Sequence, residues 1–198
     1  MRILSGRYKG RLIQMPNGIR PTQDKARKAL FDILGDIEGS SFLELFAGSG
    51  AVGFEAVSRG VAELTLVEYS PACLMAIRKN IESLKLKACD LYPKEASDAI
   101  EAFHKNKREF DIIFLDPPYY REMSKKILQM PEVYDILAPD GFVVVQHFKK
   151  ESLPKESGKL ILIKESRYGD TLLSFYRKVT INQSSMKIAE NRAQRTEK

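Results

Sequence analysis

A carboxylate, two prolines and an aromatic ring follow an apolar run in residues 111–119, which read DIIFLDPPY. The apolar, β-branched run predicts a buried strand. Pro117 and Pro118 would end this strand and stiffen the turn, because proline fixes its backbone angle and donates no hydrogen bond. We predict a rigid corner where the Asp116 carboxylate and backbone carbonyls accept the hydrogens of a planar amine while Tyr119 stacks on it. An ordinary strand closed by a Pro-Pro turn is the alternative interpretation.

Residues 42–53, FLELFAGSGAVG, combine a short apolar strand with a glycine-rich turn that opens a helix. Glycine lets a backbone turn tightly and come close to a ligand. The stretch contains GxGxxG, a pattern that dinucleotide-binding folds also use. Glu44 helps to distinguish a dinucleotide-binding turn from a turn that binds a positively charged ligand. A carboxylate beside the turn repels a pyrophosphate but suits a positive group, such as the amino group of S-adenosylmethionine (AdoMet).

Glu68 ends the next expected strand, 20 positions beyond Gly48. An acid at this place in an open α/β sheet can accept the hydroxyls of an adenosine ribose. Either Glu44 or Glu68 alone could be a solvated strand end. Together, at this spacing, the two carboxylates predict a site for an adenosine-containing ligand, which AdoMet fits.

Positive charge is concentrated at the N-terminus of the chain. The 198 residues carry a net charge of +6, and residues 1–28 hold eight lysines and arginines against one acid. A basic segment on a near-neutral body is typical of a contact surface for a polyanion. A solvated surface that only aids solubility is the alternative. The cations expected to contact RNA are Arg2, Arg7, Lys9, Arg11 and Arg20.

The composition argues against several classes of protein. No apolar run reaches about 18 residues, so no membrane span is expected. Residues 1–6 lack the apolar core of a secretion signal, which favours a cytoplasmic location. Cys73 and Cys89 are too few and too isolated for a disulfide framework or a zinc site, and His104 and His147 are solitary. We therefore expect no metal.

Alternating strand and helix patterns predict a parallel, doubly wound sheet with helices on both faces. The last two strands follow each other without a helix and predict an antiparallel hairpin. Strands are expected at 42–46, 64–68, 86–89, 111–115, 142–146, 159–164 and 171–176, and helices at 23–34, 52–59, 71–84, 94–105, 122–130 and 132–138.

The chain divides into three expected parts: a basic extension with a short β-hairpin (1–21), the α/β domain (22–178) and a polar tail (179–198). In open sheets of this kind, ligands bind beyond the carboxyl ends of the strands, where the strand order reverses. The glycine turn and the Pro-Pro corner should therefore face each other across one crevice. We expect a monomer.

Several motifs occur in a fixed order along residues 1–178. They are Arg2-Ile3 with Gly6 and Gly10-Arg11, Arg20-Pro21-Thr22 with Asp24 and Arg27, Leu30-Phe31, FAGSGA at 46–51, SRG at 58–60, DPPY at 116–119 and Tyr168-Gly169. In these motifs the chain resembles the RsmD family, bacterial methyltransferases that modify a guanine N2 of 16S ribosomal RNA. The resemblance implies a Rossmann-like class I AdoMet-dependent methyltransferase, with a mostly parallel seven-stranded sheet, a terminal antiparallel hairpin and an N-terminal RNA-contacting extension.

The resemblance also implies roles for individual residues. It places Glu44 and the 48–50 turn beside the methionine part of AdoMet, Glu68 on the ribose and Asp90 beside the adenine. The target base would be held by Asp116, Pro117, Pro118 and Tyr119, and the product would be S-adenosylhomocysteine. The partner would be 16S rRNA or a small ribosomal subunit during assembly. The full set of expected cofactor contacts is Glu44, Phe46, Gly48, Gly50, Glu68, Tyr69, Asp90, Leu91 and Asp116.

Other functions remain open at this stage. DNA adenine-N6 and protein glutamine-N5 methyltransferases use a similar Asp-Pro-Pro-Tyr corner. A nicotinamide-dependent oxidoreductase would explain GxGxxG but not the corner, and a catalytically silent RNA-binding module would explain only the charge. The chain also departs from many RsmD relatives, which carry an acid where it has Gln146-His147.

Overall fold

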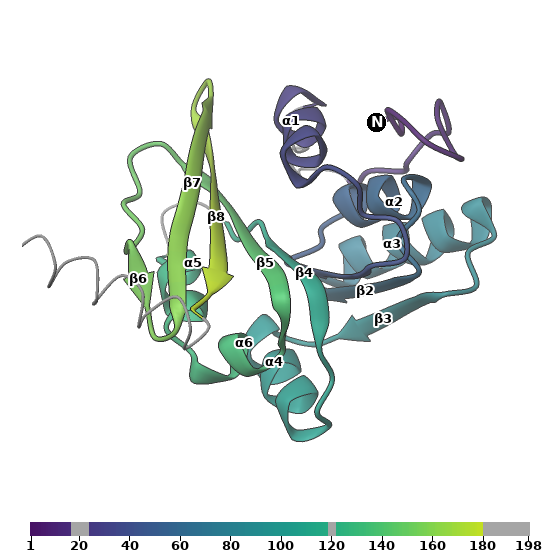
Figure 1. Ribbon diagram of the computed structural model, residues 1–198. Coiled ribbons are helices and arrows are strands. Elements are labelled where there is room, and N and C mark those ends of the chain that lie inside the picture. Colours follow the sequence, from purple (N-terminus) through teal and green to yellow (C-terminus); the bar gives the residue numbers. More distant parts are fainter. Residues whose placement is uncertain (17–23, 119–121, 180–198) are drawn as a thin grey trace, which may run out of the picture.

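The structure is a computed structural model that describes residues 1–16, 24–118 and 122–179 (Figure 1). The described strands form an eight-stranded sheet in the order β3-β2-β1-β4-β5-β8-β7-β6. The strands are β1 (Ser41–Leu45), β2 (Glu63–Glu68), β3 (Cys89–Pro93), β4 (Phe110–Leu115), β5 (Leu137–Phe148), β6 (Glu156–Ser157), β7 (Leu160–Tyr168) and β8 (Thr171–Lys178). The helices are α1 (Asp24–Leu34), α2 (Ala51–Ser58), α3 (Pro71–Leu84), α4 (Ala96–Lys105), α5 (Met123–Leu128) and α6 (Pro131–Asp135).

The first five strands are parallel, and β8, β7 and β6 continue the sheet in antiparallel pairs. The central strands β1 and β4 are buried over almost their whole length, which is typical of parallel strands covered on both faces. After β1 the chain builds outward through β2 to β3 and then returns to place β4 on the other side of β1. The strand order therefore reverses between β1 and β4, as the sequence predicts.

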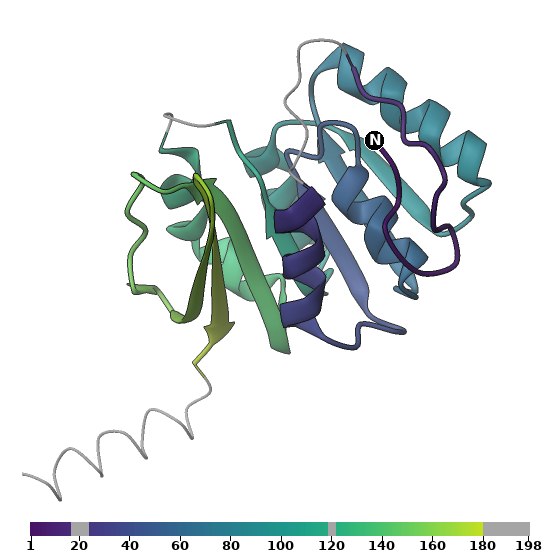
Figure 2. The ribbon, with the colours of Figure 1, turned by 90° about the horizontal axis from the view of Figure 1, so that it is seen from above.

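Two layers of helices enclose the sheet (Figures 1 and 2). On one face, α1, α2 and α3 pack with the side chains of Phe42, Leu66 and Phe114 in one apolar core. On the other face, α4, α5 and α6 pack with Leu43 and Leu45 in a second core. Successive side chains of a strand point to opposite faces of the sheet, so alternate residues belong to the two cores. The face on which a strand-end side chain lies therefore follows from its position in the sequence.

The N-terminal segment, residues 1–16, lies across α2 and α3 (Figure 2). Its Ile3 and Ile13 side chains are buried in the same core as α1 and α2. Gly6 makes the closest approach, because a Cβ at this position would lie 1.7 Å from the Ser58 carbonyl oxygen. The segment is therefore packed against the domain that carries the glycine turn.

Several expectations about the elements are wrong. The sheet has eight described strands rather than seven, because the two-residue β6 pairs with β7. β5 begins at Leu137, so the helix expected to reach 138 ends at Asp135. The short N-terminal hairpin, by contrast, is present: an antiparallel bridge joins Arg2 and Leu12, and backbone bonds link Ile3 to Arg11 and Ile13 to Met1. Residues between the two arms bind α2.

The third strand is also misplaced in the sequence prediction, which put it at 86–89, whereas β3 spans Cys89–Pro93. The physical reason lies at the end of α3. The Lys85 and Leu86 N–H groups bind carbonyls of the last helical turn, and Lys85 adopts a left-handed conformation. These residues therefore still belong to the helix end. The expected polar tail lies mostly in residues 180–198, outside the described part of the chain.

Candidate active site

Three strand ends meet at the carboxyl edge of the sheet. In the register of the parallel strands, Leu45 of β1 pairs with Val67 of β2 and with Leu115 of β4. The residues that follow these three in the sequence are Phe46, Glu68 and Asp116. The sheet therefore brings the glycine turn and the Pro-Pro corner to neighbouring places, as the topology predicts.

The glycine turn after β1 has an unusual backbone. Phe46, Gly48 and Gly50 all have positive φ angles, of 59°, 57° and 74°. This region suits glycine but is uncommon for a phenylalanine. A Cβ added at Gly48 would meet no described atom within 4 Å, so the turn leaves open space on that side. A ligand can therefore approach this backbone closely.

Glu68 holds the glycine turn from the neighbouring strand. One carboxylate oxygen, Oε2, accepts the Gly48 N–H at 2.8 Å, while Oε1 accepts the N–H groups of Tyr69 and Ser70. A carboxylate offers about four lone-pair positions, so acceptor capacity remains after these three bonds. Glu68 is 7% exposed at this edge. Its geometry suits an acceptor for a ligand hydroxyl and a support for the turn.

Glu44 lies deeper than Glu68, on the face covered by α2. Its Oε2 accepts the N–H of Gly53, within the first turns of α2, at 2.8 Å, and the residue is 3% exposed. Burial raises the pKa of Glu44 to about 8, and the negative charges of Asp116 and Glu68 add to this effect. The influence of both carboxylates shows that the three acids share one electrostatic environment. The structure thus gives Glu44 a contact with the helix that the sequence does not reveal.

The Pro-Pro corner follows β4 directly. Asp116 is half-buried, Pro117 is buried and Pro118 is exposed. Asp116 lies on the same face of the sheet as Phe114, two residues earlier, which belongs to the core under α1 and α2. Tyr119, the expected stacking ring, lies outside the described residues.

Asp90 does not lie where the family resemblance places it. It is the second residue of β3, paired with Thr65, whereas Glu68 pairs with Pro93 at the carboxyl end. Its carboxylate forms an ion pair with Arg108 at 3.0 Å. This place in the sheet does not support the assignment of Asp90 to the adenine, because the assignment depends on the misplaced strand.

Two other expected cofactor contacts, Tyr69 and Leu91, lie at different places along the sheet. Tyr69 directly follows Glu68 and is 52% exposed at the ligand edge. Leu91 pairs with Leu66 inside the sheet and packs against the core. Of the two, Tyr69 lies at the carboxyl edge and Leu91 does not. The residues that follow β3 at this edge begin with Lys94.

Most of the expected RNA-contacting cations are exposed on the N-terminal segment. Arg7 and Lys9 are exposed, and the Arg7 guanidinium lies 5.6 Å from the centre of the Tyr8 ring. Arg2 donates to the Gly10 carbonyl, and Arg11 donates to a carbonyl of α3. Arg20 lies outside the described residues.

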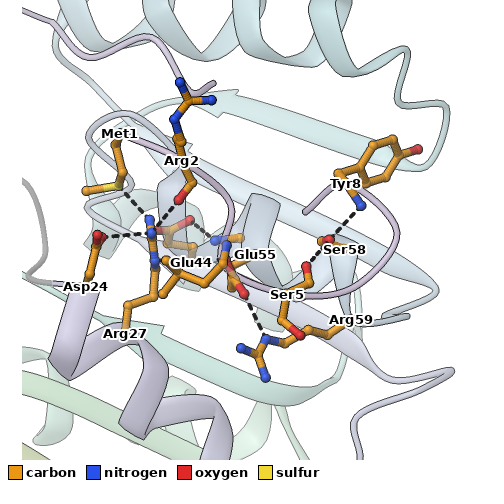
Figure 3. Close-up of polar contacts among 12 residues, drawn as sticks. Met1, Arg2, Ser5, Tyr8, Asp24, Arg27, Glu44, Glu55, Ser58 and Arg59 are labelled. Carbon is orange, nitrogen blue, oxygen red and sulfur yellow. Dashed lines mark hydrogen bonds and ion pairs between the residues drawn. The ribbon is translucent and has the colours of Figure 1, made fainter. Parts of the chain in front are cut away.

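A charge cluster around the buried Arg27 and Glu55, a set of contacts that the sequence does not reveal, ties this segment to α1 and α2 (Figure 3). Arg27 is fully buried and forms an ion pair with Asp24 at 3.0 Å, and its guanidinium also donates to the Arg2 carbonyl at 2.6 Å. Glu55 of α2 accepts the Leu4 N–H at 2.7 Å and lies 4.0 Å from the Arg27 guanidinium. Burial lowers the pKa of Arg27, although nearby carboxylates oppose this effect. The sequence motifs already single out Asp24 and Arg27, but they do not reveal that Arg27 contacts Glu55 and the N-terminal segment.

Asn80 provides a second connection that sequence reasoning missed. This α3 residue is buried, and its side chain both accepts the Gln14 N–H and donates to the Gln14 carbonyl. The same amide donates to the carbonyl of Ser49 in the glycine turn at 3.1 Å. One side chain therefore joins the N-terminal segment to the turn.

The structure also bears on metal sites and on membrane-spanning helices. Among the described residues, no three histidine, cysteine, aspartate or glutamate side chains cluster in a way that could hold a metal ion. Within the same part of the chain, no helix has the length and apolar character needed to cross a bilayer.

The reversed strand order, the glycine turn and the acids at the strand ends define the class of protein, a Rossmann-like methyltransferase. A solved structure titled "Putative methyltransferase yhhF from Escherichia coli" superposes with a TM-score of 0.75 at 30% identity, covering 90% of this chain and 97% of that one. The chain belongs to the family described as Conserved hypothetical protein 95, whose model matches residues 1–177. The resemblance to the RsmD family is thereby confirmed.

Two curated relatives share most of their length with this chain. "Putative rRNA methyltransferase YlbH" of Bacillus subtilis is 36% identical over 182 residues, which cover 90% of this chain and 99% of the relative. "Ribosomal RNA small subunit methyltransferase D" of Escherichia coli strain K12 is 30% identical over 181 residues, which cover 90% of each.

Proposed function

We propose that this protein transfers a methyl group from AdoMet to the exocyclic N2 amine of a guanine in 16S rRNA of the small ribosomal subunit. The observation that carries the proposal is the strand register, which puts Phe46, Glu68 and Asp116 side by side at one edge. The names of the curated relatives support ribosomal RNA as the substrate. An enzyme with this substrate would work in the cytoplasm.

The residues at this edge fit AdoMet. Glu68 keeps capacity to accept a ribose hydroxyl, and the open side of Gly48 admits a ligand next to the turn. Glu68 and Asp116 give the site negative character, and Glu44 adds to it when it gives up its proton, which suits the sulfonium and ammonium groups of AdoMet and disfavours a pyrophosphate. This electrostatic balance supports AdoMet over a nicotinamide dinucleotide.

Catalysis would depend mainly on placement. AdoMet supplies a methyl group that its sulfonium has already activated, whereas the guanine amine is a weak nucleophile. Asp116 and the Pro117 carbonyl would accept the two amine hydrogens and so turn the nitrogen lone pair toward the methyl group. The same bonds would stabilise the positive charge that develops on the nitrogen. The buried Pro117 keeps this corner rigid.

The N-terminal segment would hold the RNA. Arg7 and Lys9 are exposed, and the backbone on either side of them is fixed to α2 at Leu4 and to α3 at Gln14. Cations on a fixed backbone can neutralise phosphates without much ordering of the protein. This arrangement supports a positioning surface for a structured RNA.

The proposal is tested by methyl transfer from labelled AdoMet to small ribosomal subunits that lack the modification, followed by nucleoside analysis. We expect the label in N2-methylguanosine at one position of 16S rRNA. Duplex DNA and ribosomal protein serve as competing substrates in parallel reactions. Label in adenine N6 or in protein would show that the enzyme has a different substrate from the one proposed. No methyl transfer to any of these substrates would contradict the proposal.

A further inference from the structure

We propose that Gln146 binds the ring edge of the target base, with its side-chain oxygen Oε1 accepting the N1–H of guanine. This inference rests on the proposed function and adds a specificity-determining residue to the site.

Gln146 lies directly beside Asp116 in the sheet. β4 and β5 are parallel, and Leu115 pairs with Val145 at the carboxyl end of β4. The next residues on the two strands are Asp116 and Gln146. Neighbouring parallel strands lie about 4.8 Å apart, so the backbones of these two residues are next to each other.

Gln146 also shares the face of the sheet that holds the acids. Val144, two residues before Gln146, lies in the core beneath α1 and α2, as does Phe114, two residues before Asp116. Leu173, the cross-strand partner of Gln146, belongs to the same core. Side chains two apart along a strand point the same way, so Gln146 and Asp116 project to the same side.

His147 provides the contrast, because it points to the opposite face. Its Nε2 lies 2.8 Å from the Ser174 hydroxyl, which in turn donates to Glu165. Burial lowers the pKa of His147, which favours the neutral imidazole. Of these two neighbours, only Gln146 therefore lies on the face of the sheet that holds Glu44 and Asp116.

The side-chain oxygen of Gln146 is a buried acceptor without a partner. The residue is 4% exposed, and no donor in the described part of the chain lies within hydrogen-bonding distance of Oε1. Leaving such a group unpaired costs about 1–3 kcal/mol, so native proteins rarely keep one without a reason. A donor N–H from a bound base would satisfy this atom.

Guanine presents the matching donors. Its N1–H and the two hydrogens of its N2 amine lie along one edge of the ring. In this proposal the amine is held by Asp116 and the N1–H is turned toward the neighbouring strand, which carries Gln146. Buried polar groups that match a substrate N–H are effective at rejecting analogues that lack it, because the group is then left unpaired.

The test compares Gln146→Met with the wild type on two substrates: reconstituted small-subunit particles with guanine or with 2-aminopurine at the target position. 2-Aminopurine keeps the exocyclic amine but has no hydrogen on N1. On guanine, we expect Q146M to lower kcat/KM by about 5- to 100-fold, which corresponds to a lost bond of about 1–3 kcal/mol. On 2-aminopurine, we expect Q146M to show no loss relative to the wild type, because there is no N1–H to bond and only the wild type places an unpaired buried oxygen opposite N1.

Gln129→Met is the matched control, because Gln129 is an exposed glutamine at the end of α5. It should leave both rates unchanged. The Q146M protein should melt at the same temperature as the wild type or higher, since the substitution removes an unpaired buried oxygen. Equal losses on both bases, an unchanged rate on guanine, or marked destabilisation would each overturn the assignment. A wild-type enzyme that methylates neither base would overturn the proposed function itself and this inference with it.

Discussion

The carboxylate of Glu68 accepts the backbone N–H of Gly48 at 2.8 Å, so the end of β2 holds the turn that follows β1. This bond connects two parts of the site that sequence motifs treat separately. It means that the acid expected to bind the ribose also shapes the turn expected to bind the methionine part of AdoMet.

Replacing Glu68 by alanine should therefore weaken AdoMet binding by about tenfold or more, because hydrogen bonds to charged groups contribute about 1.5–3 kcal/mol each. Isothermal titration calorimetry measures the change. Glu63→Ala is the control, since Glu63 is an exposed acid at the opposite end of the same strand. An unchanged dissociation constant for Glu68→Ala would contradict both the ribose role and the support of the turn.

Asp116→Ala should strongly reduce turnover while AdoMet still binds. The loss of an oriented acceptor in the transition state is expected to lower kcat by about 100- to 1,000-fold. Single-turnover methyl transfer and AdoMet calorimetry on the same protein separate the two effects. Asp140→Ala, at an exposed site near the other end of β5, should behave like the wild type. Retained turnover would remove Asp116 from the chemistry.

The raised pKa of Glu44 predicts a pH-dependent stability. The folded pKa is about 8, above the ordinary value of 4.5, so the unfolded chain gives up this proton first as the pH rises. The free energy of unfolding should therefore fall between about pH 4.5 and pH 8, and level off above that range. Urea unfolding of the wild type and Glu44→Gln measures this, and the glutamine variant should lack this part of the pH dependence. Identical profiles would show that burial does not hold Glu44 protonated.

Binding of AdoMet should release a proton from Glu44 near pH 7. The ammonium group of the ligand favours the charged carboxylate, whereas burial favours the neutral form without ligand. Calorimetry in buffers with different ionisation enthalpies counts the protons released. The wild type should release up to about one proton per ligand and Glu44→Gln none. No release from the wild type would argue against an ammonium group beside Glu44.

Replacing Arg7 and Lys9 by alanine should weaken RNA binding and reduce its dependence on salt. Each phosphate contact that is lost should lower the slope of log affinity against log salt by about 0.7–0.9. Arg11 is a less suitable probe, because its guanidinium also binds the Ser83 carbonyl. Lys105→Ala with Lys107→Ala, two exposed cations at and just beyond the end of α4, is the charge-matched control. Equal slopes for the two double variants would show that the N-terminal cations do not contact RNA and serve only to keep the protein soluble.

Asn80→Ala should destabilise the fold by about 1–3 kcal/mol, because it leaves backbone groups of Gln14 and Ser49 without their partner. Urea denaturation measures this loss. Asn106→Ala is the comparison, as Asn106 is exposed and donates only to a carbonyl of its own helix. A similar small effect for both variants would show that the connection through Asn80 is dispensable.

The sequence predicts the central part of the site well, because short-range patterns determine it. Apolar runs locate β1, β2 and β4 to within a residue, and topology then requires Phe46, Glu68 and Asp116 to share an edge. The positive φ of Phe46 has no such signature, since no glycine marks it.

Long-range packing accounts for what the sequence does not reveal. The place of Asp90 depends on where α3 ends, and residues 86–88 have a pattern that suits a strand as well as a helix end. Arg27 and Glu55 pair across two helices and the N-terminal segment, a relationship that no local spacing encodes. The second contact of Glu44, with Gly53, becomes visible only when α2 is folded back onto β1.

The packing of residues 1–16 against α2 and α3 has a consequence for how a substrate is selected. Because Ile3 and Ile13 are embedded in the core, the cations between them cannot move like charges on a tether. The distance from the backbone that carries these charges to the acid at the tip of β4 is then set by the fold. We expect the enzyme to select its substrate by this distance and to accept only an RNA in which the contacted backbone and the extruded base are equally far apart.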